Sequence, residues 1–158
     1  MTDHVLERRF WVGCPRPDVF DFLADPRNLA LVSPPSTRLV WLAAPPASLF
    51  AGAVLDFSVR VLAVPVRWRV MIREFDRPHR FIDVQLRGPF TRWEHRHRFV
   101  EGAGPGDERC GTWVEDRLLY QMPAAWLGDV THALCAQRRI AGLFDYRDRR
   151  LRDLLTRA

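Results

Sequence analysis

The chain has 158 residues, 47% of them hydrophobic and 27% charged, and this length suits one domain, spanning 1–158, with a substantial core. Its three cysteines, Cys14, Cys110 and Cys135, are widely separated and form no Cys-x-x-Cys pair, which indicates neither a disulfide framework nor a structural zinc site. No stretch approaches the roughly 18 apolar residues of a spanning helix, and no leader is visible. We therefore expect a soluble, cytoplasmic protein without an integral membrane segment.

The formal net charge is +5, and all 24 basic residues are arginine, which raises nucleic acid as a partner. Their distribution argues against it. The arginines alternate with acidic and apolar residues instead of forming one stripe with interleaved exposed aromatics. We expect no nucleic-acid partner.

The first elements are a strand and short helices. Apolar residues recur on alternate positions up to Gly13, which predicts a strand ending there. Pro15 and Pro17 suit the first turn of a helix that Asp25-Pro26 would stop. Residues 28–31 add one further helical turn.

Extended segments fill the middle of the chain. Short connections with proline or glycine separate them, which predicts an antiparallel meander. We place these strands near 37–43, 52–61, 65–76, 79–87, 90–101 and 111–121.

The hydrophobic period then changes to that of a helix. Apolar residues from Trp126 to Leu155 fall on one face at about 100° per residue, which predicts one helix over 129–156, roughly 40 Å long. Gly142 lies in its middle, where a helix can bend. A strongly curved antiparallel sheet of about seven strands wrapped around this helix is an α+β fold, and a pocket between the two is expected.

The strand over 90–101 has two different faces. Arg92, Glu94, Arg96 and Arg98 lie on one, which we expect to be fully solvated, and Trp93, His95, His97 and Phe99 lie on the other. An unpaired imidazole in a dry core loses about 1–3 kcal/mol of hydration. The mixed inner face therefore predicts a partly polar cavity.

Asp116 shares a phase with Val114 and Leu118 on the strand expected beside the histidines. If that phase is the inner one, Asp116 can hydrogen-bond His95 or His97, fix a tautomer and raise the imidazole pKa. Three interpretations stay open, namely a self-satisfied structural network, an anchor for a ligand head group, and acid/base or metal chemistry. Only these three side chains are candidates as metal ligands, so we expect no metal and no cofactor.

The strand over 79–87 is ambiguous. Asp83 and Gln85 share a phase with Phe81, opposite Ile82, Val84 and Leu86. Periodicity alone favours the aliphatic set inside. Both faces are partly apolar, so we expect the outer one to be covered, and a homodimer is one alternative.

The order of elements resembles the helix-grip fold of the START and Bet v 1 (SRPBCC) superfamily over essentially the whole chain. Three stretches resemble bacterial ligand-binding SRPBCC-domain proteins most closely. They are Val19-Phe20-Asp21-Phe22 with Asp25-Pro26, Arg80 to Gln85 with Gly88-Pro89-Phe90, and Trp93-x-His95-x-His97-x-Phe99. Further matches are Gly111-Thr112 with Asp116 and Tyr120, and Phe144-Asp145-Tyr146-Arg147. The resemblance, unlike the periodicity, points to Phe81, Asp83 and Gln85 as pocket residues.

The resemblance implies a hydrophobic or amphipathic small molecule, such as a lipid, polyketide or quinone-like compound, held between sheet and helix. A carrier without catalysis is our first hypothesis. The alternative is a cyclase, dehydratase or isomerase with His95 or His97 as base, Asp116 orienting it and Tyr120 as donor. The expected ligand-binding residues are Trp68, Phe81, Asp83, Gln85, Trp93, His95, His97, Phe99, Asp116, Leu118, Tyr120 and Phe144. Access would be through loops 32–36, 63–66 and 123–127.

Overall fold

The computed structural model describes residues 3–61, 63–123 and 130–155, without the side chains of 107–108 and 130–135. Seven antiparallel strands form one sheet in the order β1-β7-β6-β5-β4-β3-β2. The elements in chain order are β1 (His4–Val12), α1 (Arg16–Leu23), η1 (Pro26–Ala30), η2 (Pro35–Thr37), β2 (Val40–Trp41), β3 (Val54–Val61), β4 (Val64–Asp76), β5 (Arg80–Arg87), β6 (Arg92–Gly104), β7 (Asp107–Gln121) and α2 (Val130–Leu155).

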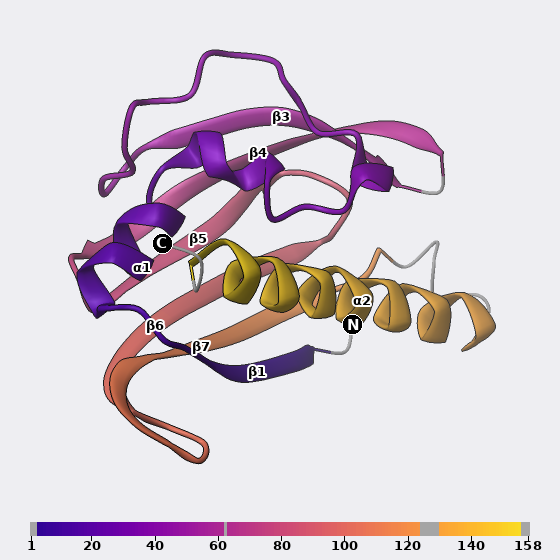
Figure 1. Ribbon diagram of the computed structural model, residues 1–158. Helices are drawn as coiled ribbons and strands as arrows, with labels where there is room; N and C mark the ends of the chain where they lie inside the picture. The colour runs from indigo at the N-terminus through magenta and orange to yellow at the C-terminus, as the bar shows by residue number, and fades with distance from the viewer. Residues whose placement is uncertain (1–2, 62, 124–129, 156–158) are drawn as a thin grey trace.

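The sheet curls around α2, which crosses its concave side (Figure 1). The short helices α1 and η1 lie on the same side of the sheet, near the C-terminal end of α2. This is the helix-grip α+β fold that the order of elements predicts. The predicted antiparallel meander is confirmed as well, because each strand from β2 to β7 pairs with its neighbour in sequence. Among the described strands only β1 pairs with a strand distant in sequence, β7.

The strand expected at 37–43 is much shorter in the structure. Only Val40–Trp41 pairs with β3. The preceding residues form η2, which Pro34 and Pro35 begin and Arg38 ends with a left-handed φ of 41°. The short helix η2 and the left-handed Arg38 take up the start of the predicted strand, so pairing with β3 begins only at Val40.

The hairpin between β6 and β7 is longer than predicted. The glycine-rich segment expected as a loop is mostly strand, since β6 runs to Gly104 and β7 starts at Asp107. The turn itself is Pro105-Gly106, where Gly106 has a φ of +68° that suits glycine.

The core has two buried clusters. In the first, Phe20 of α1 packs edge-on against the rings of Phe75, Phe81 and Phe99, which attaches α1 to the sheet. In the second, α2 covers the C-terminal end of β7. Its buried members are Leu118, Tyr120, Met122, Ile140 and Phe144.

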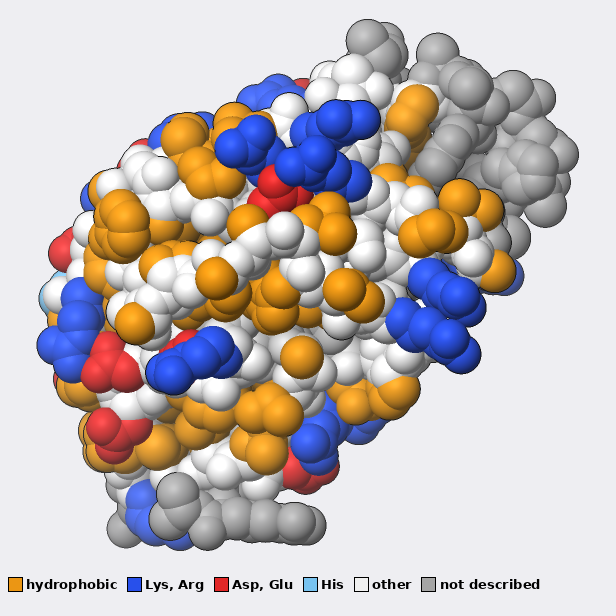
Figure 2. Space-filling view, turned by 90° about the horizontal axis from the view of Figure 1, so that it is seen from above, with side chains coloured by type: hydrophobic (Ala, Val, Ile, Leu, Met, Phe, Trp, Pro, Cys, Tyr) orange, Lys and Arg blue, Asp and Glu red, His pale blue; other side chains and the backbone are white. Residues whose placement is uncertain are grey.

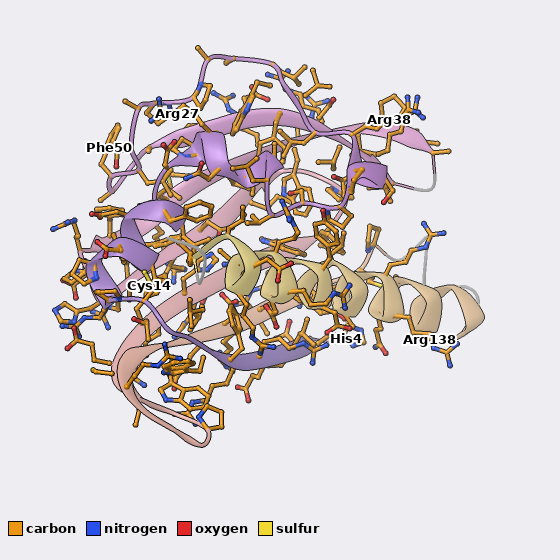
Figure 3. All side chains as sticks on the ribbon, viewed as in Figure 1. His4, Cys14, Arg27, Arg38, Phe50 and Arg138 are labelled. Carbon is orange, nitrogen blue, oxygen red and sulfur yellow. The ribbon has the colours of Figure 1, made fainter. Side chains whose placement is uncertain are left out.

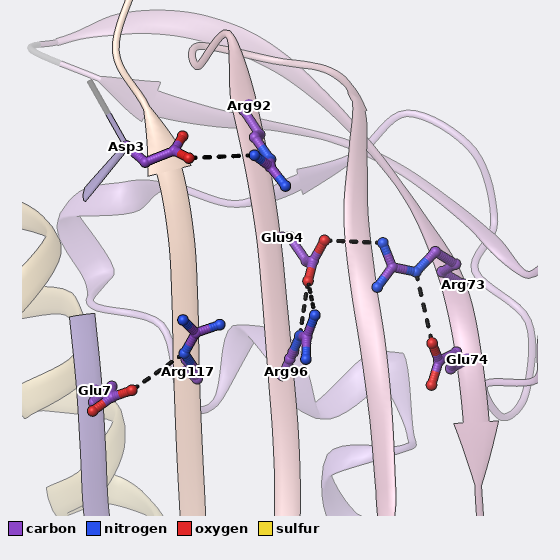
Figure 4. A network of polar contacts seen from close by, with 8 residues as sticks. All are labelled: Asp3, Glu7, Arg73, Glu74, Arg92, Glu94, Arg96 and Arg117. Carbon is purple, nitrogen blue, oxygen red and sulfur yellow. Dashed lines mark hydrogen bonds and ion pairs between the residues drawn. The ribbon is translucent and has the colours of Figure 1, made fainter. Parts of the chain in front are cut away.

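The outer face of β6 is not fully solvated, contrary to the prediction. Glu94 is only 7% exposed, because its carboxylate lies between two arginines (Figure 4). Arg73 Nη1 lies 2.9 Å from Glu94 Oε2, and Arg96 Nη2 lies 2.7 Å from Oε1. These two hydrogen-bonded guanidinium groups hold the pKa of Glu94 below its ordinary value, although partial burial opposes the effect.

On the neighbouring outer face of β5, Ile82 is buried whereas Leu86 is 52% exposed. The homodimer through this strand stays a prediction. Further exposed apolar side chains belong mainly to the segment from Leu31 to Val54, where Phe50 stands on the outside of the molecule (Figure 3). Figure 2 shows apolar side chains spread between separate arginine groups on the upper face. A search of the described helices finds none with the length and apolarity needed to cross a membrane.

Candidate functional site

Five side chains from four elements form a buried polar cluster under the second half of α2. Antiparallel register places Asp83 opposite His95 and His97 opposite Asp116, and all four point to the concave side. The two imidazole residues are 6% exposed and Asp116 is 2% exposed. The helix supplies the fifth member, Arg147, whose guanidinium contacts both His97 and Asp116. The polar cluster is therefore Asp83, His95, His97, Asp116 and Arg147.

Three hydrogen bonds fix the orientation of the rings. His95 Nε2 lies 3.0 Å from Asp116 Oδ1, and His97 Nε2 lies 3.2 Å from Asp83 Oδ2. Arg147 Nη2 lies 3.0 Å from His97 Nδ1. A guanidinium has no acceptor, so His97 Nδ1 accepts this bond and the ring carries its proton on Nε2. These bonds engage both nitrogens of His97 and one nitrogen of His95, whereas buried Asp116 Oδ2 has no hydrogen-bond partner among the described residues.

Burial alone would raise the pKa of Asp116, but opposite charge outweighs it. Arg147 Nη1 lies 3.5 Å from Asp116 Oδ2, and together with the hydrogen-bonded imidazoles it holds the pKa of Asp116 well below its ordinary value. The pKa of Asp83 is also lowered, because its hydrogen bond with His97 and the nearby positive charges overcome its burial. Both carboxylates are therefore ionised near neutral pH.

The expectation of a raised histidine pKa is wrong for His95. Burial and the neighbouring His97 lower the pKa of His95 to about 4, despite the hydrogen bond to Asp116. Taking a cation out of water outweighs the attraction of one carboxylate. His95 is consequently a neutral imidazole at physiological pH.

Aromatic rings surround the imidazoles. Phe81 stacks on His97 at 4.2 Å between ring centroids, and Phe144 of α2 meets His95 edge-on at 5.1 Å. Phe81 and Asp83 therefore face the concave side, as the resemblance implies and contrary to the periodicity. Phe99 is 2% exposed and packs with Phe20 and Phe81 in the first core cluster.

A row of aromatic rings crosses the concave face beside the polar cluster. Successive ring centroids lie 4.8 to 6.4 Å apart, and the row links β2, β3, β4, the turn after β5, β6 and β7. Its members are Trp41, Phe57, Trp68, Phe90, Trp93 and Tyr120. At its β1 end, His4 stacks on Tyr120 at 5.3 Å and also reaches Gln137 of α2, 3.0 Å from His4 Nδ1.

Two buried polar atoms beside this row have no hydrogen-bond partner. They are the donor Trp68 Nε1 and the acceptor Gln85 Oε1. The amide nitrogen of Gln85 is engaged, since it donates to the Phe90 carbonyl at 2.7 Å. Both side chains press on Gly88, where a Cβ would come within 2.9 Å of Trp68 Cδ1 and would also clash with Gln85 Oε1. Glycine at this turn therefore leaves room for both side chains.

Sequence reasoning missed two residues of α2. Arg147 completes the polar cluster, and Asp148 Oδ1 is buried without a hydrogen-bond partner. Burial and the charge of Asp116 raise the pKa of Asp148 to about 6. The signal for Arg147 is its position, because it falls on the buried face of the helix between Phe144 and Leu151.

Two open hollows lined by described residues lie outside the space between α2 and the sheet. One, of about 280 Å³, adjoins Arg16 and His79, and the other, of about 360 Å³, adjoins Pro35 and Tyr146. The internal cavity stays a prediction. Of the three expected access loops, 32–36 leads into η2, 63–66 turns into β4, and 124–127 lies outside the described residues.

The chain matches the family model described as polyketide cyclase / dehydrase and lipid transport over residues 12–142. It belongs to this family. The resemblance to the START and Bet v 1 (SRPBCC) superfamily is thereby confirmed. No curated protein matches the sequence.

Solved structures agree with this family at the level of the fold. A START superfamily protein from Mycobacterium smegmatis has a TM-score of 0.66 at 14% identity, with 96% of this chain and 99% of that chain covered. The protein TTHA0849 from Thermus thermophilus has 0.65 at 21%, with 95% and 97% covered. Ara h 8.0201 has 0.63 at 10%, with 95% and 98% covered.

Proposed function

We propose that this member of the polyketide cyclase and lipid transport family binds a hydrophobic or amphipathic small molecule between the sheet and α2, and that it acts as a carrier. The family and fold support binding of this class of ligand. The residues on the concave face define what such a ligand would meet. The aromatic row offers an apolar surface, and the polar cluster bounds it on one side.

The observation that carries the proposal is the unpartnered pair Trp68 Nε1 and Gln85 Oε1. A buried donor or acceptor without a partner costs about 1–3 kcal/mol. A ligand that places a carbonyl on the indole N–H and a hydroxyl on the amide oxygen would remove that penalty at both atoms. Apolar contacts with Trp93 and Phe90 would then hold the rest of the molecule. Hydroxylated lipids, many polyketides and hydroxyquinones carry this combination of groups.

The geometry of the polar cluster favours the carrier over the cyclase or dehydratase alternative. All four imidazole nitrogens of His95 and His97 lie within 3.6 Å of Asp83 or Asp116. A general base needs a nitrogen aimed at the proton it removes. In this arrangement each ring already faces protein carboxylates, which suits a network that shapes the site.

The carrier proposal is tested by thermal unfolding with a set of hydroxylated aromatic, quinone and fatty-acid ligands. A ligand at 100 times its Kd stabilises the folded protein by about 2.7 kcal/mol, which raises Tm by roughly 5–10 °C for a chain of this size. Gln85→Leu should weaken a hydroxylated ligand at least tenfold and affect its deoxy analogue much less. Trp113→Phe is the matched control, because Trp113 lies on the outer face, where Arg9 Cζ is 4.0 Å from the centroid of the Trp113 ring. A protein whose Tm no member of the set changes is not such a carrier.

The enzymatic alternative has its own test. The double variant His95→Gln with His97→Gln should keep ligand binding if the histidines only shape the site. Turnover of a polyketide-like substrate by the wild-type protein that disappears in this double variant, with binding retained, would establish the catalytic alternative instead.

A further inference from the structure

Three potential ligand atoms in the polar cluster converge on one point. One ligand atom each from Asp83, His95 and His97 lies within 4.8 Å of the other two. Asp83 Oδ2 is 3.6 Å from His95 Nδ1 and 3.2 Å from His97 Nε2. Ligands placed tetrahedrally at 2.0–2.1 Å from zinc stand about 3.3–3.4 Å apart. Two of the three spacings are therefore close to the edge of a metal coordination tetrahedron, and the three ligand atoms all lie within 4.8 Å of one another.

Asp116 occupies the position of an outer carboxylate. Its Oδ1 lies 3.0 Å from His95 Nε2 and 2.8 Å from His97 Nδ1, the two ring nitrogens that do not face Asp83. In metal sites a carboxylate commonly accepts the second N–H of a ligating histidine, which orients the ring and makes it more basic. Here Asp116 Oδ1 alone can accept a hydrogen bond from both His95 and His97.

The charges of the cluster also favour a cation. The cluster has two carboxylates, Asp83 and Asp116, and one guanidinium, that of Arg147. Arg147 contacts Asp116 Oδ2 and His97 Nδ1, neither of which is one of the three converging ligand atoms. Asp148, whose charge also acts on Asp116, adds a third carboxylate nearby. His95 Nδ1 and Asp83 Oδ2 face each other at 3.6 Å without a hydrogen bond between them. A cation between them would satisfy both.

We propose that Asp83, His95 and His97 form a binding site for a divalent first-row transition metal, with Zn²⁺ as its best probe. The metal would take His95 Nδ1, His97 Nε2 and Asp83 Oδ2. The proton of His97 would move from Nε2 to Nδ1, where Asp116 Oδ1 at 2.8 Å accepts it, and Arg147 Nη2 would give up its hydrogen bond to Nδ1; no proton is lost from the ring. Two histidines and one carboxylate leave the remaining coordination positions for water or a ligand oxygen. This assignment revises the sequence expectation of no metal, because Asp83 supplies the third ligand and Asp116 supports it.

The test is Co²⁺ and Zn²⁺ binding to protein freed of metal by a chelator and then desalted. We expect one equivalent of Co²⁺ to bind and to give visible d–d absorption of four- or five-coordinate intensity, which Zn²⁺ abolishes by displacement. Asp83→Asn and His97→Gln should each lower the affinity at least 100-fold. Asp116→Asn should lower it 10- to 100-fold, as expected for an outer carboxylate. His79→Gln is the control, since exposed His79 bonds Arg16 away from the cluster.

Two results would overturn the site. One is a folded wild-type protein that binds no stoichiometric Co²⁺ or Zn²⁺ at 100 μM metal. A Kd at this limit corresponds to a binding free energy of about −5.5 kcal/mol. The other is binding that Asp83→Asn and His97→Gln leave unchanged. If a variant fails to fold by circular dichroism, X-ray absorption of the zinc-loaded wild-type protein decides, because the site requires two imidazole ligands and no sulfur.

Discussion

Two titratable residues on facing elements have pKa values shifted in opposite senses. The pKa of His95 falls from 6.5 to about 4, so its contribution to stability is present above pH 6.5 and is lost as pH falls toward 4. The pKa of Asp148 rises from 3.8 to about 6, so the folded protein loses stability as pH rises from 3.8 through 6. Between pH 4 and 6 the two effects oppose each other, and the free energy of unfolding should change little.

Asp148→Asn separates these two effects in protein kept metal-free by a chelator. The variant should be more stable than wild type at pH 8 by about 1–2 kcal/mol. This free energy is smaller than the one equivalent to the full pKa shift, because Asp148 is only half-buried. It should also lose stability clearly between pH 6.5 and 4, where wild type does not. Urea unfolding at four pH values measures both. The exposed neighbour substitution Asp145→Asn is the control, and identical profiles for wild type and Asp148→Asn would contradict the assignment.

Arg147 compensates the most deeply buried carboxylate of the molecule's polar cluster. Arg147→Gln would leave Asp116 Oδ2 with no charged partner from α2, and removing one member of a buried ion pair destabilises by about 3–5 kcal/mol. We expect about 3 kcal/mol by urea unfolding at pH 7, since the contact is 3.5 Å long. Arg149→Gln, at an exposed position of the same helix, should change stability by less than about 0.5 kcal/mol. Equal effects of the two substitutions would mean that Arg147 acts only as a surface charge.

At the scale of elements, the strand phases show where sequence reasoning succeeds. On β6 the two faces differ in chemistry, so alternation alone places His95 and His97 inside, and the phase of β7 places Asp116 beside them. On β5 both phases contain large apolar residues, and period two cannot choose between them. The structure buries Phe81 on the concave face and also Ile82 on the outer face. Ile82 is covered because the ionic side chains around Glu94 lie beside it on the neighbouring outer face.

Hydrophobic periodicity places Arg147 on the buried face of α2 but does not identify its partner. A charged residue on the buried stripe of α2 looks like a solvated neighbour unless its partner is known, and the partner, Asp116, comes from a distant strand. The spacing Ile140, Phe144, Arg147, Leu151 does follow one helix face and would have identified the position. Pairing between distant elements is what the sequence alone lacks.

Gly142 tests how much α2 depends on its own propensity. The helix is continuous over Val130–Leu155, and a Cβ at exposed Gly142 would meet no atom within 4 Å. Gly142→Ala should therefore stabilise the protein by about 0.5–1 kcal/mol, because alanine loses less backbone entropy in a helix. Thermal unfolding should show a Tm increase of roughly 2–4 °C. A decrease would mean that glycine is needed at this point for another reason, such as a bend or an approaching ligand.

At the scale of the whole molecule, β1 joins the two ends of the chain. It completes the sheet by pairing with β7, with His4 opposite Tyr120 and Val12 opposite Thr112. It also contacts α2, since Arg8 lies 3.2 Å from Asp145. Most stabilising contacts of this strand therefore bridge segments that are distant in the sequence, which alternation within the strand alone cannot reveal.

Phe10→Ala measures how far the fold depends on this closure. Phe10 is 2% exposed in the first core cluster, and truncating a buried phenylalanine destabilises by about 3–5 kcal/mol. Val5→Ala on the same strand removes a side chain that is 51% exposed and should change stability by no more than about 0.5 kcal/mol. Urea unfolding followed by tryptophan fluorescence and by circular dichroism should give coincident transitions for both variants if β1 unfolds with the rest. An early, separate transition in Phe10→Ala would instead show that the sheet holds α2 without its first strand.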